Sequence, residues 1–219
     1  MPPRVIAIGD VHGCATALGP LIQTIEPRPD DTIVMLGDCV DRGPDSRGVI
    51  EQLLELKDRC HLVPILGNHE EMMLNYLDGH LQPDNWVECG GAETLRSYVS
   101  SDGKIAIPES HLEYLRSWEN WFEAEDHFFV HGSYAHDLPF PIQRWNVFRW
   151  HSLRSGLPEP HDCGKVAIVG HTSQKSGEIL DVGHLICIDT YCWGGGWLTA
   201  YEPATGQVWQ VDRQGQLRE

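Results

Sequence analysis

The 219-residue sequence is poor in positive charge and has no long hydrophobic run. Sixteen Lys and Arg stand against 32 Asp and Glu, which gives a formal net charge of −16. Because phosphate backbones and anionic membrane surfaces repel such a chain, we expect neither a nucleic-acid partner nor a membrane partner. No apolar stretch approaches the ~18 residues that a membrane span needs. The run at 5–8 is too short for the core of a signal peptide, so we expect a cytoplasmic protein.

The sequence also lacks a Cys-x-x-Cys motif, a low-complexity tract and any stretch typical of a linker. Its seven cysteines are odd in number, and its composition, 41% hydrophobic and 22% charged, is that of a globular protein. These features favour reduced thiols over a disulfide framework or a structural zinc site. We therefore expect one domain over residues 1–219, present as a monomer.

The first third of the chain alternates between strand-like and helix-like segments. Short apolar runs occupy residues 4–8, 32–36 and 61–66, and each is followed by apolar residues at helical spacing. Pro64 lies in the third run, and because proline donates no backbone N–H, that strand is expected to be short or bulged. Strands alternating with helices predict βαβ units and a parallel sheet. The expected helices cover residues 17–25, 49–54 and 72–77.

The rest of the chain changes character. Residues 80–125 are predicted to be helical and rich in loops, with the best helices at 92–99 and 111–121. Residues 138–164 are rich in proline and polar side chains, which predicts a long surface excursion. Further strands, joined by short turns, are expected at residues 127–130, 166–169, 183–188, 197–201 and 207–211.

Side chains that can bind a metal follow each of the first three apolar runs. Asp10, Asp38 and Asn68 each come directly after a glycine at the end of a run, 28 and 30 residues apart. His12 lies on the same loop as Asp10. Because ligands bind at the carboxyl ends of strands in an open parallel sheet, these donors should converge on one crevice. A single Gly-Asp after a strand is usually only a turn, but its repetition in register weakens that interpretation.

Two histidines end later apolar runs in the same way. His131 follows the run at 127–130, and His171 lies just beyond the run at 166–169. With the earlier loops this makes six oxygen or nitrogen donors, which is too many for one metal ion. They suit two ions that share one carboxylate, and Asp38, from the middle unit, is the natural bridge. With no thiolate in the set, Mn²⁺, Fe or Zn²⁺ is admitted, and we expect Mn²⁺.

A pair of metal ions points to one kind of chemistry. Two cations about 4 Å apart stabilise the attacking and leaving oxygens of an in-line displacement and lower the pKa of a bridging water. That is hydrolysis of a phosphate ester by a metal-bridging hydroxide. The phosphoryl oxygens also need a fork-shaped cation, and the leaving oxygen needs an acid. Arg42 and His69 stand beside the metal-binding positions, and Asp41 could orient the His69 imidazolium.

Five short motifs thus occur in order along the chain. They are Gly-Asp-Val-His-Gly at 9–13, Gly-Asp-Cys-Val-Asp-Arg-Gly at 37–43, Gly-Asn-His-Glu at 67–70, His131-Gly132 and Gly170-His171-Thr172. They resemble the motifs of the phosphoprotein phosphatase family, within the calcineurin-like metallophosphoesterase superfamily. By length, the chain resembles its compact bacterial and phage-type Ser/Thr protein phosphatases. The resemblance implies an α/β fold, a four-layer αββα sandwich of mixed sheets with the active site at the carboxyl ends of the strands.

The resemblance also implies which residues hold the two metal ions. The first ion would be bound by Asp10, His12 and Asp38. Asn68 would contact the substrate as well as bind a metal ion. The second ion would be bound by Asp38, Asn68, His131 and His171.

Three further roles are implied by the same resemblance. His69 would be the general acid, paired with Asp41, and Arg42 would clamp phosphate. The family usually has a second phosphate-binding arginine between its last two metal-binding histidines. The candidate here is Arg149, and its rivals are Arg144 and Arg154.

Three functions are open on the sequence alone. The leading interpretation is hydrolysis of phosphomonoesters, above all phosphoserine and phosphothreonine in proteins. The alternative is a nucleotide phosphohydrolase like the symmetrical diadenosine tetraphosphate hydrolases, which share these motifs. Such an enzyme should offer a stacking pocket and more cations, and 16 Lys and Arg weigh mildly against it. The third, a non-catalytic binding module, predicts a lost acid or clamp, yet His69, Asp41 and Arg42 are all present. Trp193 and Trp197 flank a Gly-rich turn and are expected to pack under a hairpin, with stacking on a substrate as the alternative.

Overall fold

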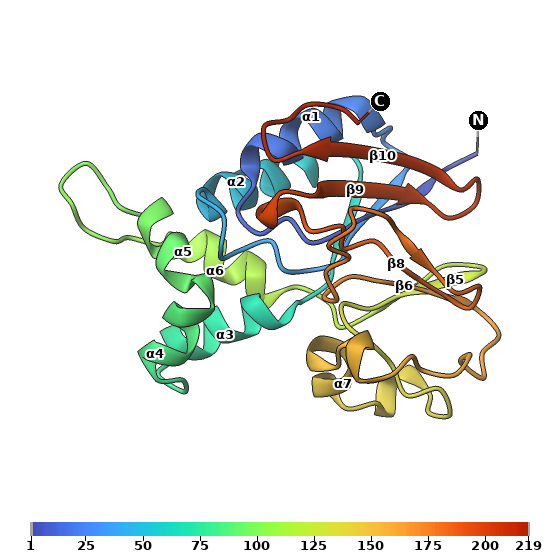
Figure 1. Cartoon of the computed structure of the whole chain (residues 1–219). Coiled ribbons are helices and arrows are strands. Elements are labelled where there is room, and N and C mark those ends of the chain that lie inside the picture. Colours follow the sequence, from blue (N-terminus) through green and yellow to red (C-terminus); the bar gives the residue numbers. More distant parts are fainter. Residues whose placement is uncertain (1, 219) are drawn as a thin grey trace.

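The computed structural model describes residues 2–218 as two sheets with helices on their outer faces (Figure 1). Side chains from both sheets share one buried cluster, which includes Ala7 and Val34 from the first sheet and Phe129 and Ile168 from the second. The two sheets therefore pack face to face. The predicted α/β sandwich of mixed sheets is confirmed.

The first sheet combines three parallel strands with an antiparallel hairpin. In spatial order it contains β10 (Gln207–Asp212), β9 (Trp197–Glu202), β1 (Val5–Ile8), β2 (Thr32–Met35) and β3 (His61–Pro64). β1, β2 and β3 run in parallel, as the βαβ pattern predicts, whereas β9 pairs with β1 in antiparallel fashion. β3 ends at Pro64, but it has four residues, as β1 and β2 do, and pairs with β2 in continuous register, so the proline makes it neither shorter than its neighbours nor bulged.

The second sheet has three parallel strands between two short antiparallel edges. In spatial order it contains β4 (Phe122–Glu123), β5 (His127–Phe129), β6 (Val166–Val169), β8 (Leu185–Cys187) and β7 (Leu180–Asp181). β5, β6 and β8 run in parallel. The edge strands β4 and β7 pair antiparallel with their neighbours and have no counterpart among the predicted strands.

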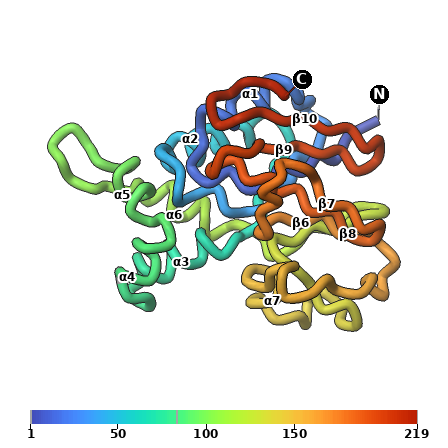
Figure 2. Tube along the Cα trace, viewed as in Figure 1, coloured from blue at the N-terminus to red at the C-terminus, as the bar shows by residue number. Residues whose placement is uncertain are grey.

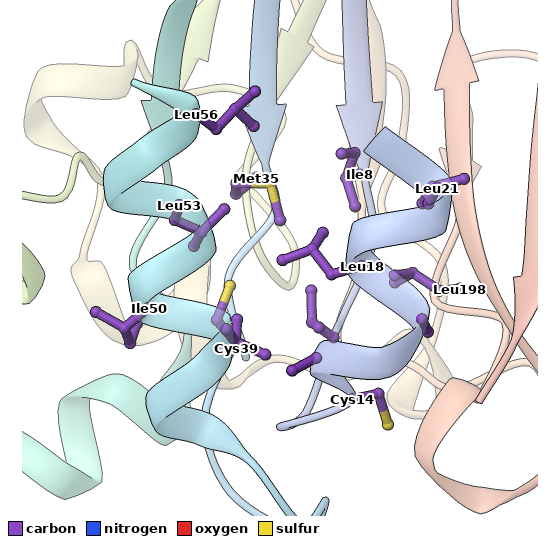
Figure 3. Packing of buried hydrophobic residues seen from close by; sticks show 14 of the residues in the cluster. Ile8, Cys14, Leu18, Leu21, Met35, Cys39, Ile50, Leu53, Leu56 and Leu198 are labelled. Carbon is purple, nitrogen blue, oxygen red and sulfur yellow. The ribbon is translucent and has the colours of Figure 1, made fainter. Parts of the chain in front are cut away.

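Two amphipathic helices, α1 (Ala15–Ile25) and α2 (Ser46–Leu56), cover the outer face of the first sheet. Figure 3 shows Leu18 from α1 and Leu53 from α2 in one cluster with Met35 of β2. The apolar residues of each helix recur at a spacing of three or four, which places them on one face. Burying each such side chain is worth roughly 1.5–3 kcal/mol. This packing holds the loops that follow β1 and β2 in fixed positions.

The middle of the chain is helical, as predicted. Its elements are α3 (Asn68–Leu77), α4 (Pro83–Trp86), a π-helical turn (Val87–Gly91), α5 (Ala92–Ser97) and α6 (Glu109–Arg116). The helix expected at 111–121 ends at Arg116, because Glu119 pairs with the chain beyond β3. Its N–H donates to the Pro64 carbonyl, and its own carbonyl accepts the N–H of Leu66.

The excursion predicted at 138–164 is only partly right. Figure 2 shows this segment running along the second sheet, where it forms α7 (Trp145–Trp150). Phe140 and Phe148 are buried in one cluster with Phe128 of β5. The outer face of the second sheet is apolar and needs a cover, so the segment serves as the fourth layer of the sandwich.

None of the helices that the structure describes combines the length and the apolar character that a membrane span requires.

Candidate active site

Loops at the carboxyl ends of the central strands carry the residues that the sequence singles out. Five of them have positive φ angles: His12 at 45°, Asp38 at 47°, Asp41 at 70°, Arg42 at 68° and His171 at 62°. A non-glycine residue in this region costs about 1–3 kcal/mol and persists only where its surroundings fix it. The strain therefore marks loops whose side chains are held in place for a purpose.

Glu70, which the sequence analysis missed, is the anchor of these loops. Its buried carboxylate accepts four backbone N–H groups, from Asp38 at 2.9 Å, Cys39 at 2.7 Å, Val40 at 3.1 Å and Gly67 at 3.0 Å. Burial, with the charge of Asp38 added, raises the pKa of Glu70 to about 7. The available signal was its place in the Gly-Asn-His-Glu motif, because a Glu three residues after a helix N-cap often bonds backbone N–H groups.

One group of donors surrounds one side of Asp38. Ligand atoms of His12, Asp38 and His69 lie within 4.8 Å of one another. The Nδ1–H of His12 donates to the Val40 carbonyl at 3.0 Å. Its Nε2 is therefore the atom that can bind a metal; it lies 3.6 Å from Asp38 Oδ2 and accepts a hydrogen bond from Arg42 Nη1 at 2.7 Å. His69 belongs to this group by distance, with Nε2 3.9 Å from Asp38 Oδ2, whereas the prediction has Asp10 as the metal ligand here and His69 as the general acid.

A second group meets the other side of the same carboxylate. Asp38, His131 and His171 form it, again with ligand atoms within 4.8 Å. Asn68 Oδ1 lies 3.0 Å from His131 Nε2 and 2.9 Å from His171 Nδ1, so it belongs to the same group. His131 Nδ1–H donates to the Leu36 carbonyl at 2.7 Å. Asp38 is thus the one member shared by the two groups, in the bridging position that the spacing predicts.

Asp10 lies between the two sheets and links their loops. Its carboxylate accepts the backbone N–H of His171 at 3.0 and 3.1 Å. Burial, then the charges of Asp189 and Asp38, raise its pKa well above the usual range. Three buried carboxylates crowded together repel one another. A divalent cation among them would remove that repulsion.

The pKa values of the remaining donors shift in different directions. Burial lowers the pKa of His12 and, with the nearby His131, lowers that of His171 to about 4. Burial works against ionised Asp38, but His131 and His69 outweigh it and hold its pKa well below the usual range. Burial works against a charged His131, but Asp38 outweighs burial and raises the pKa of His131. Because neutral imidazoles and an ionised carboxylate are the forms that coordinate metal, His131 must release its proton when a metal binds. The donor set, all nitrogen and oxygen, therefore fits two divalent ions that share Asp38.

His69 and Asp41 form the pair that the resemblance implies. His69 Nδ1 lies 2.7 Å from Asp41 Oδ2, and both side chains are buried. Asp41 also accepts hydrogen bonds from Trp86 Nε1 at 2.9 Å and Thr94 Oγ1 at 2.7 Å. These bonds fix the carboxylate, which in turn fixes the imidazole with Nε2 toward Asp38. Trp86 and Thr94 carry no motif, so the sequence offers no signal for their part.

Arg42 lies where the metal-binding groups meet a cleft. Its Nη1 is 2.7 Å from His12 Nε2, and its guanidinium lies 5.1 Å from the centroid of the Trp193 ring. Trp193 is only partly buried and lines the cleft, which favours the stacking alternative over packing under a hairpin alone. The cleft has a volume of about 670 Å³. Its lining includes Arg42, Glu88, Glu93, Arg154, His171, Lys175, Tyr191 and Trp193.

The structure separates the candidates for a second phosphate-binding arginine. Arg149 is buried, with Nη1 3.3 Å from Glu71 Oε1 and Nη2 bonded to Asn120. Arg144 is exposed at the start of α7. Arg154 alone of the three lines the cleft beside His171. The geometry thus favours Arg154 over the predicted Arg149, whose guanidinium is engaged elsewhere.

The two-sheet sandwich and the carboxylate–imidazole cluster at its strand ends define a metallophosphoesterase. The family described as Calcineurin-like phosphoesterase matches residues 3–191. The chain belongs to that family.

Curated relatives carry a more specific description. The chain is 31% identical over 126 residues to the "Bis(5'-nucleosyl)-tetraphosphatase, symmetrical" of Janthinobacterium sp. (strain Marseille). This match covers 57% of this chain and 42% of the relative. It is 44% identical over 73 residues to the protein of the same description from Salmonella arizonae, or 33% of this chain and 25% of the relative. The chain thus spans less than half the length of these relatives.

Solved structures share the fold at lower identity. A protein described only provisionally as a diadenosine tetraphosphatase matches with a TM-score of 0.72 at 22% identity, over 96% of this chain and 95% of its own. A cold-active protein-tyrosine phosphatase from a Shewanella species matches with a TM-score of 0.68 at 17% identity, over 100% of this chain and 80% of its own. At such identities the likeness shows the fold alone.

Proposed function

We propose that this chain hydrolyses a phosphoanhydride bond in dinucleoside tetraphosphates. The observation that carries the proposal is the cleft beside the metal-binding groups, where Arg42, Arg154 and Lys175 gather with the rings of Tyr191 and Trp193. Cations pair with a polyphosphate chain, and aromatic rings stack with nucleobases. The description of the curated relatives supports the same substrate class.

The overall count of Lys and Arg misleads here, because it ignores where the cations lie. The chain has 16 such residues, yet three of them line one cleft, and Lys175 lies 5.6 Å from the Tyr191 ring centroid. A phosphoprotein substrate, the leading expectation from sequence, has no observation in its favour beyond the shared phosphoesterase chemistry. The alternative expected from sequence is therefore the better supported.

The residues of the chain divide the work of the reaction among them. Two divalent cations, held by Asp10, His12, Asp38, Asn68, His131 and His171 and not by His69, would supply positive charge to the phosphoryl oxygens and acidify water. Arg42 offers a planar fork of N–H donors to two phosphoryl oxygens. His69 holds a proton on Nε2 for the departing oxygen, and Asp41 stabilises the imidazolium that carries it. A nucleoside diphosphate then leaves from the attacked phosphorus.

A substrate panel tests the proposal. Purified chain with Mn²⁺ is assayed on diadenosine tetraphosphate, a phosphothreonine peptide and p-nitrophenyl phosphate, with the nucleotide products separated by anion exchange. We expect kcat/KM for the dinucleotide to exceed that for the peptide by about tenfold or more, with ADP as the product. Higher kcat/KM on the peptide would refute the proposal and restore the protein phosphatase.

A further inference from the structure

Arg42 and Trp193 form a wall with a hollow on each side. The larger hollow is the cleft described above, of about 670 Å³. The smaller one has a volume of about 380 Å³, and Arg42 and Trp193 line it as well. The rest of its lining consists of Cys14, Thr16, Gly43, Pro44, Arg213 and Gln214. Both volumes fall in the range of roughly 300–1,000 Å³ that is typical of small-molecule sites.

The shared wall stands directly beside the reacting centre. Arg42 reaches His12, and the ring centroids of His12 and Trp193 are 6.2 Å apart. A substrate phosphorus gripped by Arg42 would therefore have an open hollow on either side. Hydrolysis of a phosphomonoester needs only one, since the attacked phosphorus carries a single organic group.

A dinucleoside polyphosphate needs both hollows. In an in-line displacement, the leaving half departs opposite the attacking oxygen, while the other half stays bonded to the attacked phosphorus. The two halves therefore extend from the reacting centre in different directions. A wall that grips the central phosphates, with room on both sides, matches this requirement.

We propose that the smaller hollow binds the second nucleotide half of the substrate, with Arg213 as its phosphate ligand; this inference rests on the proposed function. Among the described residues, the exposed Arg213 side chain has neither a hydrogen bond nor an ion pair. Its guanidinium is therefore available to a phosphate group. Gln214 adds an amide for ribose or base, and Trp193 presents an aromatic wall on which a base can stack.

Arg213→Gln tests the assignment, with Arg59→Gln as the matched control. Arg59 is exposed as well, and it lies at a separate hollow between α1 and α2. Steady-state kinetics on diadenosine tetraphosphate and p-nitrophenyl phosphate are measured for both variants and the wild type. Loss of a charge-assisted phosphate contact should raise KM for the dinucleotide about tenfold more than KM for the small ester in Arg213→Gln. Arg59→Gln should change neither.

Two outcomes would overturn different statements. If the wild type hydrolyses the dinucleotide and Arg213→Gln affects both substrates equally, or neither, the smaller hollow does not bind the second half. If the wild type hydrolyses p-nitrophenyl phosphate but not the dinucleotide, the proposed function itself fails. The melting temperature of each variant shows that a change in KM does not come from misfolding.

Discussion

Backbone carbonyls decide which imidazole nitrogens can bind metal in this protein. The Val40 carbonyl takes the Nδ1–H of His12, and the Leu36 carbonyl takes that of His131. Each bond holds a proton on Nδ1 and makes Nε2 the ligand atom, which lies 3.6 Å from Asp38 in His12, where it also accepts from Arg42, and 3.4 Å from Asp38 in His131. A hydrogen-bonded Nδ1 also makes the ring a more basic ligand. Two buried carbonyls thus prepare two ligands before any metal arrives.

At the same scale, His69→Asn tests the general acid. His69 pairs with Asp41 through Nδ1, so we expect Asn to leave metal content and KM close to the wild type while kcat falls. General acid catalysis is typically worth about 10²–10⁴-fold. The loss should be large for an alkyl phosphate and much smaller for p-nitrophenyl phosphate, whose leaving group needs no proton. Equal losses on the two esters would contradict the role.

Arg42→Lys tests the clamp. Lysine keeps the charge but loses the planar fork, so it should not replace arginine at a bidentate contact. We expect kcat/KM to fall by about 10–100-fold, with a weaker inhibition by inorganic phosphate. If Arg42 were only structural, melting temperature would fall while the phosphate inhibition constant stayed the same. Arg116→Lys, at an exposed ion pair with Asp78, is the control.

At the scale of elements, strand ends were the predictable part of the site. A polar residue after a Gly at the end of an apolar run is a local pattern, and Asp10, Asp38 and Asn68 were found by it. Side chains that act from a distance in sequence were not predictable. Thr94 donates a hydrogen bond to Asp41, which is 53 residues away in the sequence, and no residue spacing predicts such a contact. The engagement of Arg149 with Glu71 was hidden for the same reason.

Asp31 joins the ends of several elements and gives a pH-dependent test. The side chain is fully buried, and Arg28 and Arg4 donate to it. Burial alone would raise its pKa, but these arginines prevail and lower it well below the usual value. A carboxylate whose pKa is lower in the folded than in the unfolded state stabilises the fold at pH values above its unfolded pKa, near 4. This stabilisation is lost as the pH falls further.

We therefore expect Asp31→Asn to lower the melting temperature by about 5 °C at pH 7. The difference in melting temperature between the variant and the wild type should become progressively smaller below about pH 4, because the Asp31 carboxylate of the wild type then stabilises the fold less. Asp30→Asn is the matched control, since Asp30 is largely exposed and 3.7 Å from Arg28. A difference that stays constant from pH 7 to pH 3 would show that packing, not charge, accounts for the loss.

At the scale of the whole molecule, the metal-binding groups join the two sheets. Asp10, Asp38 and Asn68 follow strands of the first sheet, whereas His131 and His171 follow strands of the second. The hydrogen bond from His171 to Asp10 is one direct link between them. Ions bound between these loops would link the two sheets at the carboxyl ends of their strands. Metal binding should therefore appear in global stability as well as in activity.

After a chelator has removed its metal, the protein should bind two equivalents of added Mn²⁺ and recover its thermal stability. At free metal near 100 times Kd, each ion adds about 2.7 kcal/mol, and each 1 kcal/mol moves the melting temperature of a chain this size by about 2–4 °C. Two ions should thus raise it by about 10 °C or more. Asp38→Asn should lose most of this rise, because Asp38 serves both groups, whereas exposed Asp58→Asn should keep it. Elemental analysis measures the stoichiometry on the same samples. One tight equivalent with full activity would exclude a pair of ions, and an unchanged melting temperature would exclude metal binding between the sheets.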